Sequence, residues 1–411
     1  MEELQMLAVT TDSEEAIAAI NRWIEQSLSY GKDAETAILE AIAADPNCAI
    51  AHAYAAAYYL SLENAIGWKE ASVHVKLAQQ YSKNITKREK MYVDAIAAWW
   101  SKKIDLALVL HEAIASEFPQ DLISVQQGQY HYFYLGDKER LLKIAEKVLP
   151  ANPNNGYLYG MIAFGLEQCH RLSQAEKMGR KAAEINRQDA WAHHAVAHVM
   201  ETQGRVDEGI AWMESLASTW ENCNSMLYTH NWWHVALYYL ERGDMEKVLE
   251  LYDTKVWGGA RKATPKDQVG AISLLLRLEL RGVYVGDRWQ KLAAYLRPRI
   301  HEHALPFQDL HYIYALARTG SSQAVSEMLT SMKKHAKTAS IAWNEVAIPA
   351  AQGMIAHANG DWSKTVDLLK PVLPKLSEIG GSHAQRKLFD QVYFDALKAT
   401  SMVSRNRFAI V

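Results

Sequence analysis

A spacing of 34 residues recurs in the middle of this 411-residue chain and restricts the folds open to it. Asp121, Asn155 and Asp189 follow one another at that interval, and each stands just before an apolar stretch of helical periodicity. Their side-chain oxygens are suited to cap the free N–H groups at a helix N-terminus. A constant period of this length indicates a structural unit repeated along the chain, with each copy packed on its neighbours.

The turn inside each unit keeps the same interval. Gly136, His170 and Gly204 fall 34 residues apart, where the chain is expected to reverse between two helices. Small residues fall where paired helices cross most closely, and in the unit DAWAHHAVAHVMETQGRVDEGIAWMESL these are Ala197 and Gly209. The pattern predicts helix-turn-helix hairpins of the tetratricopeptide type.

The same pattern continues, with drifting spacing, towards the C-terminus. Gly243, Gly320 and Gly360 mark further turns, and Thr86 with Glu89 forms the sequence signature of a capping box. We therefore predict an all-α fold, a right-handed α-solenoid of about ten hairpins. No linker rich in Gly, Ser or Pro interrupts it.

This solenoid is predicted to form a single continuous domain over residues 1–411. The least regular stretch, near 255–268, is expected to be a loop. A capping helix is expected near 382–400, because an array of repeats needs a polar outer end.

Charge and cysteine content exclude several classes of partner and site. The 44 basic and 47 acidic residues leave a net charge of -3, so we expect neither nucleic acid nor a membrane as partner. Cys48, Cys169 and Cys223 are scattered, which argues against disulfides and thiolate zinc sites and favours a reducing compartment. The opening MEELQMLAVTTDSEEA is unlike a signal peptide, and no apolar run is long enough to span a membrane. A cytoplasmic location is expected.

Four stretches of the chain resemble the tetratricopeptide repeat protein 38 family. They are AHHAVAHVMETQGRVDEGIAWME (192–214), THNWWHVALYYLERGDMEKVLELYD (229–253), LLLRLELRGVYVGDRW (274–289) and GGSHAQRKLF (380–389). The resemblance implies a helical-repeat fold. It carries over no activity, cofactor or functional residue.

Histidines gather on the expected concave face of two neighbouring units. Counting back from Gly204, His194, His198 and Glu201 take the concave positions of one helix, at spacings of four and three residues. The next first helix brings His230 and His234, also four residues apart. Because adjacent helices lie roughly 8–10 Å apart, these side chains are expected to meet over the groove.

Three interpretations of this cluster stay open. His194, His198, His230 and His234 suit a divalent metal ion such as Zn, Fe, Mn or Ni. Alternatively, the imidazoles and Glu201 act as acids and bases on a small substrate without a metal. The third interpretation is that they only pack and hydrogen-bond within a polar groove.

Other positions are candidates for ligand binding. The same counting places Tyr130, Phe164 and Glu167 on the groove in earlier units, and His311, with Asp309 near it, in a later one. Trp233 flanks the histidine pair, and His383 and Arg386 follow a Gly-Gly-Ser turn in which Ser382 is expected to cap a helix. The leading prediction is a protein whose His- and aromatic-lined groove binds a small ligand or a partner peptide. The alternative is an enzyme acting on a small organic substrate there, with or without a metal ion.

Overall fold

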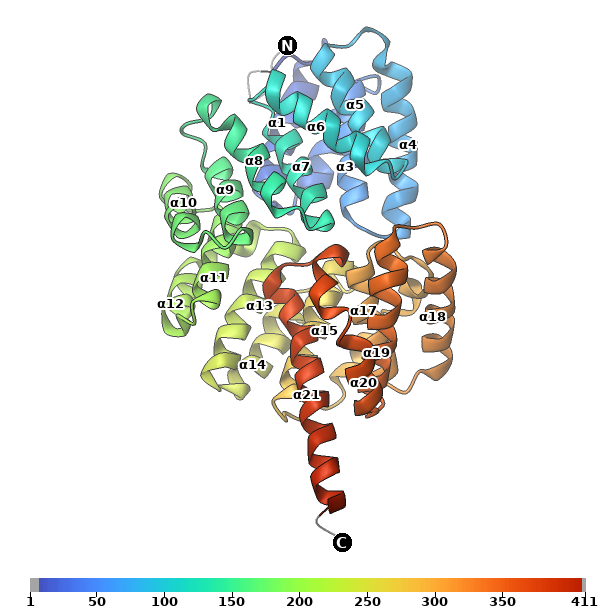
Figure 1. Cartoon of the computed structure of the whole chain (residues 1–411). Coiled ribbons are helices and arrows are strands. Elements are labelled where there is room, and N and C mark those ends of the chain that lie inside the picture. The colour runs from blue at the N-terminus through green and yellow to red at the C-terminus, as the bar shows by residue number, and fades with distance from the viewer. Residues whose placement is uncertain (1–6, 409–411) are drawn as a thin grey trace. The chain divides into compact units, whose positions relative to one another are not determined.

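The polypeptide is built from helices that follow one another in antiparallel pairs (Figure 1). The computed structural model describes residues 7–408, with side chains through residue 401. Within that range there are 21 α-helices: α1 to α20 pair in sequence as ten hairpins, and α21 ends the series. The predicted all-α array of tetratricopeptide-like hairpins is therefore confirmed. No helix among these residues is both long and apolar enough to cross a bilayer.

The chain divides into two compact units, the first made of residues up to 133 and 137–231, the second of 134–136 and the residues from 232 onward. The first contains α1 (Glu14–Leu28), α2 (Ala34–Ala44), α3 (Ala49–Ser61), α4 (Ala65–Tyr81), α5 (Lys87–Trp100), α6 (Ile104–Glu117), most of α7 (Leu122–Leu135), α8 (Lys138–Val148), α9 (Gly156–Gln168), α10 (Leu172–Ile185), α11 (Ala190–Thr202) and α12 (Val206–Leu216).

The second unit starts within α13 (Ser225–Arg242). It continues through α14 (Met245–Leu251), α15 (Pro265–Leu280), α16 (Arg288–Ala293), α17 (Pro306–Arg318), α18 (Ser322–Ala336), α19 (Ile348–Ala358), α20 (Trp362–Leu369) and α21 (His383–Phe408). The irregular stretch expected near 255–268 contains the end of a π-helical segment and the turns before α15, and the expected capping helix corresponds to α21. The single continuous domain expected over residues 1–411 therefore remains a prediction, and the structure is described as two compact units.

The predicted caps are in place. Asp121, Asn155 and Asp189 each accept a hydrogen bond from the backbone N–H three residues later, at 2.9, 3.3 and 3.1 Å. Thr86 and Glu89 form a reciprocal capping box at the start of α5. These side chains satisfy N–H groups that have no partner inside the helix, so the sequence period directly marks where helices begin.

The turn residues have the backbone conformation that their position requires. Gly136, His170 and Gly204 have φ angles of 71°, 57° and 68°, and the later turn glycines are also in the left-handed region. Glycine adopts this region without penalty, whereas a residue with a Cβ pays about 1 kcal/mol. His170 thus occupies a glycine position at some expense in stability.

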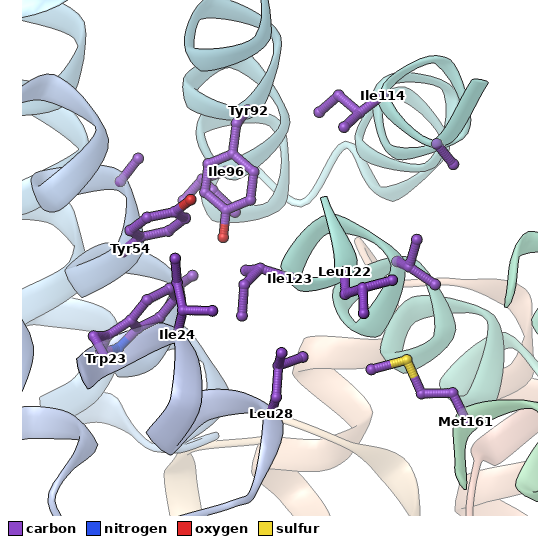
Figure 2. Packing of buried hydrophobic residues seen from close by; sticks show 14 of the residues in the cluster. Trp23, Ile24, Leu28, Tyr54, Tyr92, Ile96, Ile114, Leu122, Ile123 and Met161 are labelled. Carbon is purple, nitrogen blue, oxygen red and sulfur yellow. The ribbon is translucent and has the colours of Figure 1, made fainter. Parts of the chain in front are cut away.

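Aromatic residues from successive first helices form the centre of the first unit. The ring of Trp23 in α1 stacks on Tyr54 in α3 at 4.2 Å, and Tyr54 meets Tyr92 in α5 edge-on at 5.0 Å. Figure 2 shows these rings beside the aliphatic side chains that α1, α7 and α9 contribute to the same cluster, namely Ile24, Leu28, Leu122, Ile123 and Met161. The first helix of the chain is therefore a full member of this core.

A buried ion pair crosses the same region. Arg88 donates to Asp121 at 3.2 Å and to the hydroxyl of Tyr54 at 3.1 Å, and both charged side chains are almost completely buried. Asp121 also caps α7. One carboxylate thus fixes the start of α7 and neutralises a cation that would be costly to bury alone.

The turn between α1 and α2 lies against later hairpins of the first unit. Tyr30 stacks on Trp191 of α11 at 5.0 Å, and its carbonyl accepts from the N–H of Asn224 at 2.6 Å. Gly31 and Cys223 form an isolated β-bridge, and Lys32 N–H donates to the carbonyl of Asn222 at 3.0 Å. This turn therefore covers part of the face on which the candidate histidines were predicted.

In the second unit, α21 is held by a buried arginine. Arg277 of α15 donates to the carbonyl of Ala384 at 2.7 Å and to the side chain of Gln391 at 2.9 Å. Ser382 and Gln385 form a capping box at the start of α21, as expected for Ser382.

Candidate functional site

Two histidines of α11 form the starting point of the site. His194 and His198 stand one helical turn apart and are 2% and 0% exposed. Asp189 caps the helix and fixes where its first turn begins, which sets the direction of both side chains. Their Nε2 atoms lie 2.9 Å apart.

A third histidine comes from α13. His230 Nε2 lies 3.1 Å from His194 Nε2, and the ligand nitrogens of His194, His198 and His230 all lie within 4.8 Å of one another. The neighbouring Asn231 donates to the carbonyl of Ala190 at 3.2 Å, which holds this part of α13 against the start of α11. Three imidazole edges therefore face a common point inside the first unit.

A carboxylate lies behind this group. Glu167 of α9 is 0% exposed, and its Oε1 is 3.7 Å from His198 Nδ1, the nitrogen on the opposite side of the ring from the other histidines. Its other oxygen accepts from Gln168 Nε2 at 2.6 Å. At this distance the carboxylate and the imidazole form an ion-pair contact rather than a hydrogen bond.

The remaining two residues of the predicted cluster are His234 and Glu201. His234 is buried and follows His230 by one turn of the same helix, in the part of α13 that belongs to the second unit. Glu201 is partly exposed, and among the described residues it is absent from the closely spaced groups of potential metal ligands. The carboxylate beside His198 is thus Glu167, which occupies the equivalent position one repeat earlier.

Aromatic side chains enclose the histidines. The Phe164 ring lies 5.7 Å from that of His194 and 6.2 Å from that of His198, and Trp191 lies 4.6 Å from His194. Tyr30 covers the outer face of Trp191. A wall of this kind lowers the local dielectric constant and strengthens electrostatic interactions inside it.

The adjacent histidine is not part of the cluster. His193 is buried inside the hairpin, where its Nδ1 accepts from Trp220 Nε1 at 3.1 Å. Burial lowers its pKa to about 4, so the ring is neutral near pH 7.

Tyr130 lies in the first unit but is bound elsewhere. Its hydroxyl donates to Glu63 at 2.9 Å, and its ring lies 5.1 Å from that of Trp99. These contacts come from α5 and the turn after α3. Tyr130 is therefore engaged by earlier hairpins of the same unit rather than by the histidine cluster.

Two predicted residues of the second unit are buried among its helices. Trp233 meets His234 edge-on at 4.9 Å and lies under the guanidinium of Arg277 at 5.5 Å. His311 donates from Nδ1 to the carbonyl of Phe307 at 2.8 Å, and burial lowers its pKa to about 4. Both fit the packing of α13, α15 and α17.

The other three predicted residues lie at loops and helix starts of this unit. Asp309 accepts from His303 Nδ1 at 2.6 Å. His383 is the first residue of α21, and Arg386 donates to the carbonyl of Gly381 in the turn before it. Within the first unit, the ligand nitrogens of His194, His198 and His230 are the predicted site atoms that lie within 4.8 Å of one another.

Comparison with known proteins finds only distant likeness to solved structures. No family model matches the chain. A Rap protein complexed with competence and sporulation factor is 16% identical over 79% of this chain and 99% of its own, with a TM-score of 0.46. The human IFIT1 dimer with PPP-AAAA is 12% identical, and the match covers 99% of this chain and 89% of the IFIT1 chain, with a TM-score of 0.46. The APC/C hetero-tetramer Cut9–Hcn1 is 11% identical, and the match covers 90% of this chain and 69% of the other, with a TM-score of 0.44. At such values the likeness transfers neither ligand nor activity.

Proposed function

We propose that this helical-repeat protein binds a divalent transition metal ion through the Nε2 atoms of His194, His198 and His230. The observation that carries the proposal is the pair of Nε2–Nε2 separations at His194, 2.9 and 3.1 Å. Nitrogens bound to one tetrahedral Zn²⁺ at 2.0–2.1 Å are about 3.3 Å apart. Hydrogen bonding alone serves this arrangement poorly, because a neutral imidazole nitrogen has either one proton or one lone pair.

The surroundings support the same proposal. Glu167 beside His198 Nδ1 provides the outer-shell carboxylate that metal-bound histidines commonly have. A neutral all-imidazole set favours Zn, Ni, Cu or Fe over Mg or Ca.

A compact ligand fits this face better than an extended peptide. Tyr30 stacks on Trp191, and Glu63 accepts from Tyr130, so segments of the chain itself already contact these two aromatic side chains of α11 and α7. A peptide lying along these helices would have to displace those segments. Recognition therefore centres, in this proposal, on the ion and on a small molecule bound to it.

The resemblance to the tetratricopeptide repeat protein 38 family belongs to this proposal. Two of the stretches that carry it, 192–214 and 229–253, contain the three proposed ligands. If the resemblance reflects common descent, relatives should keep histidine at these three positions. Relatives that fold alike but lack them would separate the metal site from the family.

The experiment is metal analysis of untagged protein that has never met a metal-affinity column. Elemental mass spectrometry is expected to give about one transition metal ion per chain after incubation with Zn²⁺ and gel filtration. The His194→Gln and His230→Gln variants should each lose most of it. His301→Gln, at an exposed histidine, is the matched control. Circular dichroism establishes that each variant is folded, and metal retained in folded His194→Gln would refute the proposal.

A metal-dependent enzyme is a second candidate, favoured by the three-nitrogen set. Three protein ligands leave a coordination position for water or substrate, as in catalytic zinc sites. Cobalt-substituted protein provides the test: azide should shift its visible absorption bands if that position is open. Unchanged bands at saturating azide would indicate a closed site and leave metal binding without this activity.

A further inference from the structure

The second unit contains a hydrogen-bonded chain of an acid, an imidazole and a hydroxyl. His303 lies in the loop before α17, Asp309 in the first turn of α17, and Ser331 in the last turns of α18. His303 Nδ1 is 2.6 Å from Asp309 Oδ2, and His303 Nε2 is 2.7 Å from Ser331 Oγ. Three elements thus bring together three groups that are not adjacent in sequence.

The partners determine the direction of each hydrogen bond. Asp309 as a carboxylate only accepts, so His303 Nδ1 carries the proton and donates to it. His303 Nε2 is then unprotonated and accepts from the Ser331 hydroxyl. This is the order that activates a serine: the imidazole is poised to take the hydroxyl proton, and the buried carboxylate stabilises the imidazolium that forms.

The loop holds His303 in an unfavourable backbone conformation. Its φ angle is 48°, in the left-handed region where a residue with a Cβ pays about 1–2 kcal/mol. Its ring lies 6.0 Å from Trp343 and 5.4 Å from His335, and its side chain is 4% exposed. Strain held by surrounding contacts is found preferentially at functional sites.

We propose that Ser331, His303 and Asp309 form an acyl-transfer site that hydrolyses small acyl esters. Ser331 is only partly buried, so its hydroxyl is within reach of a substrate, whereas Asp309 is 1% exposed and shielded from water. His335 stands one turn after Ser331 on α18, on the same helical face. It is the side chain placed to donate to the carbonyl oxygen of a bound ester.

The reaction is balanced by these groups and one water. Ser331 Oγ bonds to the acyl carbon while its proton passes to His303 Nε2. The bond from the acyl carbon to the alcohol oxygen breaks, and the leaving alkoxide takes that proton. Water then attacks the acyl-serine and gives its proton to His303. The bond between Oγ and the acyl carbon breaks, the carboxylic acid departs, and Oγ regains the proton.

The test uses diisopropyl fluorophosphate on the full chain, followed by peptide mass spectrometry. Activated Ser331 should displace fluoride, gaining the diisopropylphosphoryl group while the hydroxyl proton leaves with fluoride. Ser331→Ala should remove this modification, and His303→Gln and Asp309→Asn should slow it at least 100-fold. Ser326→Ala, an exposed serine on the same helix, is the matched control and should label normally.

The readings are made on protein shown to be folded by circular dichroism, with and without EDTA. Labelling of Ser331 that survives EDTA is independent of the metal site in the first unit, so either proposal can fail alone. Absence of label on Ser331 in folded wild type would overturn the acyl-transfer site. Equal labelling of several serines, unaffected by Asp309→Asn, would overturn it as well.

Discussion

The ring of Tyr30 lies on the ring of Trp191 at a centroid distance of 5.0 Å, with 25° between their planes. One residue belongs to the first turn of the chain and the other to α11, whose next turn carries His194. Trp191 in turn contacts the His194 ring at 4.6 Å. The N-terminal hairpin therefore forms the outer cover of the histidine cluster.

Removal of this cover should loosen the site. Tyr30→Ala deletes the stacked ring and is expected to lower the free energy of unfolding of the first unit by about 1–3 kcal/mol. The variant loaded with Zn²⁺ should lose it to EDTA several times faster than wild type, because solvent gains access through Trp191. Tyr284→Ala, at a tyrosine that is 88% exposed, should leave both quantities unchanged. Equal release rates for Tyr30→Ala and wild type would contradict the covering role.

Substitution of the two candidate carboxylates, Glu167 and Glu201, should affect Zn²⁺ affinity differently. Glu167→Gln should weaken Zn²⁺ binding about 10- to 100-fold, because a neutral amide supports His198 less well than a carboxylate. Glu201→Gln should change affinity by less than about twofold, since Glu201 lies outside the group of close ligand atoms. Competition with a chromogenic chelator measures both. A larger loss of Zn²⁺ affinity in Glu201→Gln than in Glu167→Gln would show that Glu201 is the carboxylate that supports the site.

The buried ion pair of Arg88 and Asp121 should matter far more than an exposed one. Asp121→Ala leaves a buried guanidinium without its carboxylate and removes the cap of α7, so we expect a loss of about 3–5 kcal/mol. Asp94→Ala breaks the exposed pair with Lys90 and should cost less than about 0.5 kcal/mol. Urea unfolding followed by circular dichroism compares them, and similar losses would rule out a special role for burial.

Asp189 should make stability depend on pH. Burial raises the pKa of this carboxyl from 3.8 to about 7, although two backbone N–H groups donate to it. Among the residues that the structure describes, its Oδ2 has no hydrogen-bond partner. The folded state then holds a proton that the unfolded state has lost, so this group's contribution to stability falls as pH rises from about 4 to 7.

Asp189→Asn keeps a cap oxygen and has no charge to bury. Its melting temperature relative to wild type should therefore rise by several degrees between pH 4 and pH 8, as measured by differential scanning calorimetry. Asp207→Asn, at an exposed aspartate, should show no such trend. A constant difference across this range would show that Asp189 is ionised throughout.

The turn positions offer a matched pair. His170→Gly relieves a left-handed histidine and should stabilise the protein by about 0.5–1 kcal/mol. Gly204→Ala introduces a Cβ at the equivalent turn of the next hairpin and should destabilise the protein by about 1 kcal/mol. Thermal unfolding of both variants measures this. Destabilisation by His170→Gly would mean that contacts of the imidazole stabilise the protein by more than the backbone strain at this residue costs.

Much of the local structure was predictable because it depends on neighbours in sequence. Caps at Asp121, Asn155 and Asp189 and left-handed turns at Gly136 and Gly204 follow from a period that every repeat shares. Helical spacing also predicted that His194 and His198 share a face. Their approach to His230 depends on packing between neighbouring repeats, and the structure brings these three nitrogens together.

Contacts across several repeats were not predictable in the same way. Glu167 and Glu201 hold equivalent places 34 residues apart, so periodicity alone could not decide which one approaches His198. Tyr30 and Trp191 are far apart in sequence, so no local pattern of residues could predict that their rings stack. The link of His303 to Asp309 and Ser331 depends on an unusual loop angle, for which a histidine at that position gives no signal.

The backbone link between the first turn and the segment before α13 has a consequence for unfolding. In an open repeat array the terminal repeats fray first, because each has only one neighbour. Here the bridge of Gly31 with Cys223, and the hydrogen bonds of Tyr30 and Lys32 beside it, give the first hairpin a second partner far along the chain. Fraying from the N-terminus would break both attachments at once. Amide hydrogen exchange in α1 should therefore be as slow as in α9 and α11, and the first unit should open as a single cooperative block.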